Sequence, residues 1–478
     1  MSGAVKPSDL QGNILRGYKR GFVRHLLLGV RDRASARAFL GAAAAGGRAD
    51  IPAVTTESGA RWSRQPGGCK PAACFNVGLT YDGLRALGVA ASSLATFPTE
   101  FVAGMAQRAA KLGDFGDSAP DRWAKPFDRP DRIHVVASIY ADDLAEIDRV
   151  QAQVEPAFTK LGALDGRNLP GNRVFFNYVD SMSQPRFDGV HDRDQSGVDE
   201  PSDPLGTALL GHPTRLERLM FRVPSPSVLG LNGSFNAFRV LAQDCAGFEA
   251  YLTEAAETLL RHPEVDSLLA KGAERQIDPD HPDLDRKGAL REVVAAQMCG
   301  RWRFNGAPLV NAPDGPGSAS PPKGLLINFD YTRDSVCPAG AHIRRVQPRG
   351  APIVQRISSR TRRLVRRGMV YGPDFDPARP DTAERGLLGN FIGASLGAQF
   401  EAVMYDWLNL GLQDPDITGS NDPLTGANAP ESSWFDLRLR TGGAIRLRGL
   451  PRFVTTRGGV YAFLPSVPAI AYLAALGA

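Results

Sequence analysis

Residues 233–260, GSFNAFRVLAQDCAGFEAYLTEAAETLL, combine an apolar strand pattern, an aspartate at the turn and an alanine-rich helix with aromatic residues. The same order stands near the start of the chain, where the strand pattern VRHLLLGV at 23–30 leads through Asp32 into the helical ASARAFLGAAAA at 34–45. An aspartate at the start of a helical run is a typical capping residue. The repeated module predicts two related α+β halves.

More strand and helix patterns lie between these two modules. ACFNVGLTY at 73–81 is typical of a strand and enters the helical DGLRALGV, residues 97–114 have helical periodicity, and RIHVVASIYADD at 132–143 leads into the helical LAEIDRVQAQV. This alternating order favours an α+β sandwich with helices on one face of a sheet. Polar, proline-bearing residues follow from 191, so we predict an N-terminal domain at 1–190, a linker at 191–215 and a C-terminal domain at 216–478.

Composition limits the class of protein. Of the 478 residues, 43% are hydrophobic and 22% are charged, which excludes global disorder. Five cysteines without a disulfide pattern fit a reducing compartment, and the first residues lack a signal-peptide core, so we predict a cytoplasmic protein. The uncharged run 458–478 is interrupted by Pro465 and Pro468, which argues against a membrane anchor.

The chain lacks common catalytic motifs, including a phosphate-binding GxxxxGK[ST] loop, HExxH, paired CxxC and GxSxG. No two of its seven histidines are spaced as zinc ligands on one helix face. His342 is distinctive because CPAGAHIRRVQPR places one imidazole beside Arg344, Arg345 and Arg349. A haem iron takes an axial nitrogen and its propionates need cations, so this setting suits haem. A solvated surface loop or a phosphate site fits the same residues.

Two further segments carry candidate functional residues. An arginine-rich run at 356–367 could suggest nucleic-acid binding, but few aromatics interleave with it and the net charge is only +5. Strand alternation in LVRRGMVYG should also turn some of these arginines inward. Asp180, in FFNYVDSMSQPRFDG, lies between an apolar strand and a Ser-Gln-Pro turn, where a carboxylate can project into a cavity or simply cap the turn.

Taken together, ordered segments along nearly the whole chain resemble the dye-decolorising peroxidases, in particular the bacterial type. The similar segments are DLQGNILRGY, FPTEFVAGMAQRAAKLGDFGDSAPDRW, VDSMSQPRFDG, CPAGAHIRRVQPR, LVRRGMVYGP, AQFEAVMYDWLN and FVTTRGGVYAFLPSVPA. The resemblance implies an α+β fold of two ferredoxin-like halves with antiparallel sheets and peripheral helices, a dimeric α/β-barrel-like architecture. It implies haem b held mainly by the C-terminal half, with the distal loop supplied by the N-terminal half.

The resemblance also assigns roles to single residues. His342 becomes the proximal iron ligand, Asp180 the distal acid/base and Arg366 the distal cation. Arg349 becomes a propionate contact, and Glu401 the acceptor for the second imidazole nitrogen. The implied partners are hydrogen peroxide and a bulky aromatic, phenolic or dye-like reductant, with no nucleic acid or membrane involved and with self-association possible.

These roles are chemically coherent. Peroxide on the iron must lose a proton from its near oxygen and gain one on its far oxygen, and Asp180 can relay it while deprotonated. A free aspartate titrates near 3.9, so such a base works in acid where a histidine would already be charged. Arg366 would stabilise the charge that develops on the departing oxygen.

The chain departs from the family pattern at three positions near the implied peroxide site. The family's Gly-x-x-Asp-Gly loop here has Asn177 and Ser181 in place of the glycines, so serine adds a Cβ near the cofactor. Gly389 stands where the family usually has a phenylalanine, which predicts a larger pocket or entry of water. A haem-binding protein with little peroxidase activity, used for storage, sensing or another oxidation, is therefore an alternative. A haem-free scaffold or nucleic-acid binder is a third hypothesis.

Overall fold

The computed structural model describes residues 5–62, 68–180, 182–190, 202–317, 326–332, 336–353 and 360–477. Its strands are β1 Phe22–Gly29, β2 Ala73–Leu79, β3 Val135–Ala141, β4 Thr159–Arg167, β5 Ser234–Gln243, β6 Val365–Arg366, β7 Met369–Tyr371, β8 Gly386–Gly393, β9 Trp434–Arg438, β10 Ala444–Arg448 and β11 Val454–Leu464. Its longer helices are α2 Arg33–Ala44, α7 Leu144–Val154, α9 Cys245–Leu260, α11 Arg286–Cys299 and α14 Val467–Ala474.

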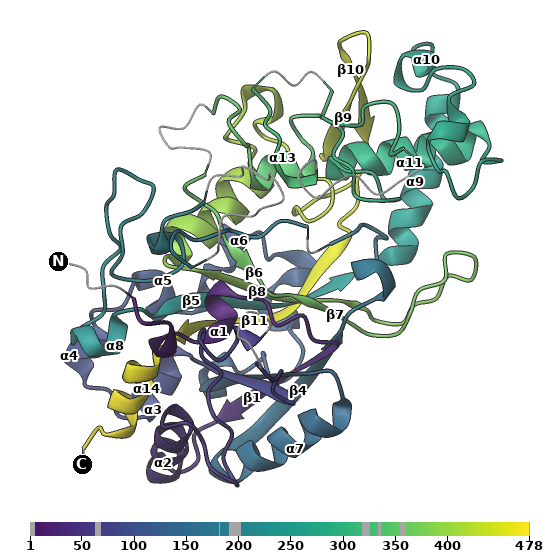
Figure 1. Cartoon of the computed structure of the whole chain (residues 1–478). Coiled ribbons are helices and arrows are strands. Elements are labelled where there is room, and N and C mark those ends of the chain that lie inside the picture. Colours follow the sequence, from purple (N-terminus) through teal and green to yellow (C-terminus); the bar gives the residue numbers. More distant parts are fainter. Residues whose placement is uncertain are drawn as a thin grey trace.

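Short helices connect these elements. They include α1 Gly12–Leu15, α3 Tyr81–Ala86, α4 Ala91–Leu94, α5 Thr99–Ala103, α6 Ala109–Leu112, α8 Ser227–Gly230, α10 Val265–Leu268 and α13 His342–Val346. Two consecutive segments with π-helical hydrogen bonding, η11 Leu396–Glu401 and η12 Val403–Asn409, form one long helical stretch. Figure 1 shows the arrangement of these elements.

The repeated module is confirmed at both places where the sequence predicts it. β1 leads into α2, and the Asp32 carboxylate accepts a hydrogen bond from the Ser35 amide. β5 leads into α9, and Asp244 accepts from the Gly247 amide in the same way. In both modules the aspartate satisfies an amide that the first helical turn leaves unpaired.

The helix expected over 97–114 is broken. Gly104 has a φ of +77°, so the chain leaves the α conformation after α5 and continues as a 3-10 turn, Met105–Arg108, and then α6. Helical periodicity is present on both sides of this residue, but glycine allows the left-handed backbone that separates the pieces.

The main sheet closes on itself. Its strand order is β5-β11-β2-β3-β1-β4-β7-β8-β6, and an additional pairing of β5 with β8 completes a ring. All of these pairings are antiparallel. The two halves of the ring meet through single residue pairs, Phe463 with Leu79 and Arg167 with Val370. The result is the antiparallel α+β barrel that the sequence predicts.

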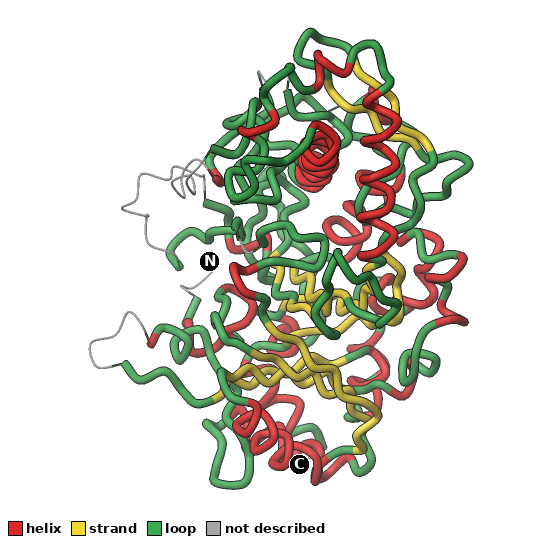
Figure 2. Tube along the Cα trace, turned by 90° about the vertical axis from the view of Figure 1, so that its right-hand side faces the viewer, coloured by secondary structure: helices red, strands yellow, loops and turns green. Residues whose placement is uncertain are grey.

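Helices cover the barrel at both ends of the molecule. Figure 2 shows the strands in the middle of the protein with helices above and below them. α14, from the end of the chain, packs against α2, near its beginning, as Figure 1 shows at the lower left. One apolar core joins the N-terminal strands and helices to β5, β8, β11 and α14, and a second lies around α9, α11 and the small β9–β10 sheet.

The predicted domain boundaries stay a prediction. Residues 191–201 of the expected linker lie outside the described residues. The part that the structure describes is packed, because Leu209 and Leu210 are almost fully buried. In addition, the uncharged segment 458–478 forms the end of β11 and α14. Across the described part of the chain, no helix has the length and apolarity that crossing a bilayer requires.

His25 lies inside the barrel, between its two halves. Its Nδ1 is 2.9 Å from Ser138 Oγ on the neighbouring β3, and its Nε2 is 3.4 Å from Asn390 Nδ2 on β8. The ring also packs edge-on against Phe238 of β5. Burial lowers the pKa of His25 to about 3, and the charge of Asp165 opposes this shift only in part.

This depressed pKa predicts an acid-labile barrel. The unfolded chain binds a proton on this imidazole below about pH 6.5, whereas the folded chain does so only near pH 3. Protonation of His25 therefore leaves the free energy of unfolding unchanged above pH 6.5. Below pH 6.5 it lowers this free energy by up to about 1.4 kcal/mol per pH unit.

We expect His25→Asn to reduce this acid sensitivity. Its unfolding free energy, measured by urea denaturation from pH 7 to pH 4.5, should fall less steeply than that of the wild type. The gap between the two proteins should change by about 2 to 3 kcal/mol over this range. Parallel pH profiles would contradict a neutral, buried His25.

Candidate active site

His342 begins α13, directly after the bend CPAGA. Its Nδ1 is 3.0 Å from Oδ2 of Asp422, whose side chain is fully buried. The other oxygen of Asp422 accepts from the amides of Leu424 and Thr425 and from the Thr425 hydroxyl. An ionised carboxylate only accepts hydrogen bonds, so Nδ1 is the protonated nitrogen of the imidazole. In the neutral imidazole Nε2 then carries the lone pair, and it has no hydrogen-bond partner among the described residues.

The environment keeps Asp422 ionised. Burial raises the pKa of its carboxyl group, but the charge and hydrogen bond of His342 and the charge of Arg345 outweigh this effect. The pKa of Asp422 therefore lies below its ordinary value. A histidine that donates one N–H to a carboxylate and offers its second nitrogen is the usual arrangement of a metal-ligating imidazole.

Arg345 fixes this arrangement from behind. Its guanidinium is buried and donates to the carbonyl oxygens of Gly340, Trp407 and Ser420. These bonds tie α13 to η12 and to the loop that contains Asp422. The Asp422 amide also donates to the Leu408 carbonyl at the end of η12. The position of the imidazole is thus set by a network that spans three separate segments.

The predicted role of Glu401 as the imidazole partner is wrong. Glu401 is fully buried, but its two carboxylate oxygens accept from Nε and Nη2 of Arg108 at 2.8 and 2.6 Å. The Tyr461 hydroxyl donates to the same carboxylate at 3.0 Å. All its strong hydrogen bonds therefore go to groups other than His342. The family resemblance assigned this role to Glu401, whereas the partner of His342 is Asp422, in the irregular segment 418–430.

Arg344 and Arg349 follow His342 on the chain, and each guanidinium packs on an aromatic ring. The Arg349 guanidinium is almost fully buried, lies 4.3 Å from the centre of the Phe329 ring and donates to the Ile327 carbonyl. Arg344 lies over the Tyr331 ring and donates to the Cys337 carbonyl. Their contact with a propionate stays a prediction, but both supply positive charge beside His342.

The Asp180 loop is held in place by its neighbours. The Asp180 amide donates to the Asn172 carbonyl, and the Arg173 guanidinium donates to the carbonyls of Asn177 and Arg303. The Asp180 side chain is exposed and forms no hydrogen bond or ion pair with the described residues. Asn177 has a φ of +63°, so this position does need the left-handed backbone, and asparagine tolerates it. Ser181 lies outside the described residues.

The structure brings this loop to the strand of Arg366. Gln184, in the turn after Asp180, exchanges two hydrogen bonds with the backbone of Arg366 at 2.9 and 3.0 Å. The Arg366 side chain is exposed and donates to the carbonyls of Ser183 and Leu364. Arg367 points the other way and donates to the Asn13 carbonyl, which confirms that the strand turns successive arginines to opposite faces.

One turn lies against both the segment of His342 and the Asp180 loop. It runs from Gly300 to Gly306, after α11. A Cβ added to Gly300 would lie 2.6 Å from Ile343, next to His342, whereas one added to Gly306 would lie 2.5 Å from the Met182 sulfur, in the Asp180 loop. Burial raises the pKa of the neighbouring Cys299 thiol to about 12, and the charges of Asp422 and Asp180 add to this rise, against that of Arg301. Both carboxylates therefore lie in one neighbourhood.

The predicted gap at Gly389 is absent. A Cβ on this residue would lie 2.5 Å from Cε2 of Phe391, so the Phe391 ring occupies the space beside the glycine. Position 389 by itself predicts an empty space, whereas the ring that occupies it comes from Phe391, two residues further along the same strand.

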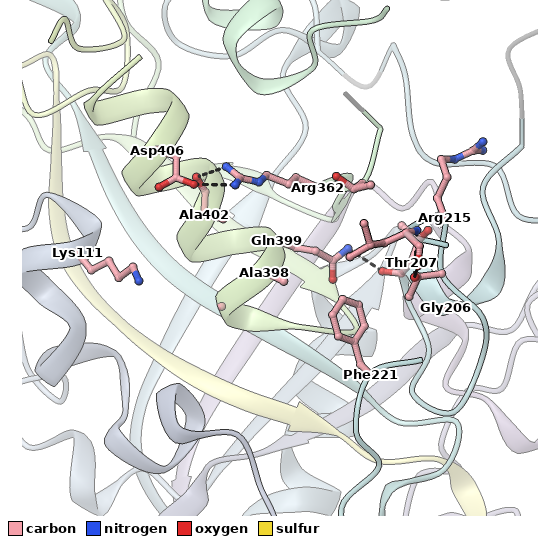
Figure 3. A pocket seen from close by; sticks show the side chains of 14 residues that line it. Lys111, Gly206, Thr207, Arg215, Phe221, Arg362, Ala398, Gln399, Ala402 and Asp406 are labelled. Carbon is pink, nitrogen blue, oxygen red and sulfur yellow. Dashed lines mark hydrogen bonds and ion pairs between the residues drawn. The ribbon is translucent and has the colours of Figure 1, made fainter. Parts of the chain in front are cut away.

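A cavity of about 320 Å³ lies beside η11 and η12. Figure 3 shows its lining, in which Arg362 reaches Asp406 and Gln399 turns toward Thr207. The Arg362 guanidinium also lies 4.7 Å from the centre of the Trp407 ring. The volume suits a small molecule. Among the described residues, no cluster of three or more histidine, cysteine, aspartate or glutamate side chains could hold a metal ion by itself.

The chain is similar to dye-decolorising peroxidases over its whole length. The family model for the DyP dimeric alpha+beta barrel domain matches residues 9–166. A multifunctional dye peroxidase, DyP2, from Amycolatopsis sp. is 29% identical, over 97% of this chain and 95% of the relative. A dye-decolorizing peroxidase from the fungus Exidia glandulosa is 27% identical, over 98% of this chain and 87% of the relative. The comparisons support membership of the DyP-type peroxidase family.

Solved structures agree with this placement. A fungal DyP-type peroxidase from Auricularia auricula-judae has a TM-score of 0.78 at 23% identity, over 99% of this chain and 100% of that chain, and confirms the fold. A dye-decolorizing peroxidase in complex with 2,6-dimethoxyphenol has a TM-score of 0.76 at 26% identity, over 98% of this chain and all of that one. Because the relatives include a bacterial and several fungal proteins, the expected bacterial type stays a prediction.

The reassignment of Glu401 leads to a stability prediction. Replacing Glu401 by glutamine removes the charge that holds Arg108 and the Tyr461 hydroxyl, so we expect the free energy of unfolding to fall by about 2 to 3 kcal/mol. Asp436→Asn, which breaks a more exposed ion pair with Arg446, is the control and should cost less than about 1 kcal/mol. Equal losses in urea denaturation would contradict a strong, buried Glu401 network.

Proposed function

We propose that the protein is a haem b peroxidase that reduces hydrogen peroxide with electrons from bulky aromatic, phenolic or dye-like donors. The observation that carries the proposal is the His342 imidazole. Its Nδ1 is committed to the buried Asp422, and its Nε2 has no partner among the described residues. The relatives named as dye-decolorizing peroxidases give independent support.

The residues present fit haem. His342 would hold the iron through Nε2, and Asp422 would keep the imidazole in the required tautomer and raise its donor strength. Arg349, with Arg344 beside it, would supply cations for the propionates. When bound, haem supplies a redox-active iron with a coordination position open to peroxide.

Asp180 and Arg366 would handle the peroxide. The exposed Asp180 carboxylate has no competing partner among the described residues, so it is available to accept a proton from one peroxide oxygen and return it to the other. Arg366, held close to the Asp180 loop by Gln184, would stabilise the negative charge on the departing oxygen.

The class of electron donor follows from the relatives. One solved relative is described in complex with 2,6-dimethoxyphenol, and the curated relatives are named for the oxidation of dyes. We extend phenolic and dye-like donors to this chain. Location in the cytoplasm and self-association stay predictions.

One observation favours the second candidate, a haem-binding protein with little peroxidase activity. The Arg366 guanidinium already donates to two backbone carbonyls, those of Ser183 and Leu364. Reaching a peroxide would require it to leave at least one of them. Steady-state oxidation of a dye by peroxide separates the two functions, because only a peroxidase turns over.

The axial role of His342 can be tested in the haem-free protein. In a titration with haem, we expect His342→Ala to lose the Soret band of the histidine-ligated form. Asp422→Asn should weaken haem binding by about 10- to 100-fold, because the imidazole loses the carboxylate that orients it. His281→Ala, which changes an exposed histidine paired with Asp278, is the control and should leave the spectrum unchanged. An unaltered Soret band in His342→Ala would rule out axial ligation.

The roles of Asp180 and Arg366 call for a second experiment, on haem-loaded protein mixed with one equivalent of peroxide. We expect Asp180→Asn to slow the spectral change by about 10²- to 10⁴-fold, since proton relay is lost. Arg366→Leu should slow it by about 10²- to 10³-fold. Asp376→Asn, at an exposed site, is the control. Wild-type rates in both distal variants would show that other groups react with peroxide.

A further inference from the structure

Gly389 and Phe391 lie on the same face of β8, because alternate residues of a strand point to the same side. In the antiparallel pairing of β8 with β6, Phe391 is directly opposite Arg366. Residues opposite each other in such a pair share a face of the sheet. Gly389, Phe391 and Arg366 therefore face one way, whereas Asn390 faces His25 inside the barrel.

The Phe391 ring leans back along the strand over Gly389. A Cβ at 389 would lie 2.5 Å from Cε2 of this ring, a separation that real Cβ atoms essentially never show, and 3.0 Å from its Cζ. Gly389 is not among the glycines with positive φ, so its backbone would accept other residues. The need for glycine is therefore one of space, and the Phe391 ring creates it.

The ring is supported on one side and open on another. Phe400 of η11 packs against it with ring centres 5.4 Å apart and an angle of 32° between the planes. Phe400 is buried and in turn meets Tyr461 edge-on. Phe391 itself remains partly exposed, as Arg366 does on the same face. The Phe391 ring is therefore held by Phe400 and is still partly exposed on the face of β8 that carries Arg366.

We propose that Phe391 is an aromatic wall on the face of β8 that carries Arg366, where the proposed function places peroxide, and that it determines which molecules reach Arg366 and the iron. This inference rests on the proposed function. Phe391, which carries this ring, lies two residues, or roughly 7 Å, along β8 from position 389. The ring then leans back over Gly389, so the pair acts as one unit: the glycine gives the space and the phenylalanine fills it.

The first test measures the coupling between the two positions in the haem-free protein. Gly389→Phe by itself should lower the thermal unfolding midpoint, because its side chain collides with the Phe391 ring. Combining it with Phe391→Ala should recover most of that loss, since the ring that causes the collision is gone. If the unfolding midpoint of the double variant falls by the sum of the two single decreases, the idea that the Phe391 ring fills the space beside residue 389 is wrong.

The second test uses ferric, haem-loaded protein and two probes of different size, cyanide and imidazole, with binding followed by the Soret shift. We expect Phe391→Ala to tighten imidazole binding at least tenfold and to change cyanide binding less than threefold. Phe391→Leu keeps an apolar side chain in place and should tighten imidazole binding by a smaller factor if the alanine variant folds poorly. Phe158→Leu, which changes a ring packed edge-on against Phe39 of α2, is the control and should leave both affinities unchanged.

The outcomes separate this inference from the proposed function. A chain that binds no haem overturns both of them. A haem-loaded chain whose ratio of imidazole to cyanide affinity is the same in the wild type and in both Phe391 variants overturns only the role of Phe391.

Discussion

The hydrogen bond between His342 and Asp422 is the interaction on which the site depends. A buried carboxylate is costly unless it is fully hydrogen-bonded. Asp422 meets this requirement with amides and a hydroxyl on one oxygen and with the imidazole on the other. Removing the imidazole would leave a buried charge short of a partner. The same bond that fixes the orientation of the imidazole therefore also holds the loop around Asp422 to α13.

The closed barrel explains how distant segments come to form one site. Asp180 follows the N-terminal strands, whereas Arg366 and His342 belong to the C-terminal half. The halves share one ring of strands, and the turn from Gly300 to Gly306 touches both the axial segment and the Asp180 loop. Because interiors are close-packed, a shift of one half would strain this turn. The placement of Asp180 relative to His342 is thus a property of the whole barrel.

The sequence could predict what depends on neighbours along the chain. Asp32 and Asp244 each cap the helix that they precede, and such bonds span only three residues. It does not reveal Asp422, which lies 80 residues from His342 in an irregular loop, and the family resemblance points to Glu401 instead. The residue pairs that join the two halves are equally hidden, because each is a single contact, such as Phe463 with Leu79.

Position 389 shows a related limit. Considered by itself, a glycine in place of a phenylalanine indicates an empty space. The side chain that fills this space comes from two residues further along the strand, and only side-chain coordinates show which way its ring leans. Several neighbouring side chains together fill each part of a protein interior. A smaller residue at one position therefore indicates a cavity only when its neighbours are unchanged.

Acidity acts on the site and on the fold in different pH ranges. The pKa of Asp422 is below its ordinary value, so the stability that it contributes is present above about pH 3.9 and is lost only as the pH falls below that. His25, with a pKa of about 3 in the barrel, begins to destabilise the folded state below about pH 6.5. As the pH falls, the barrel therefore weakens well before the Asp422 carboxylate is protonated. Loss of the barrel in acid thus sets a lower pH limit for any activity that the folded chain supports.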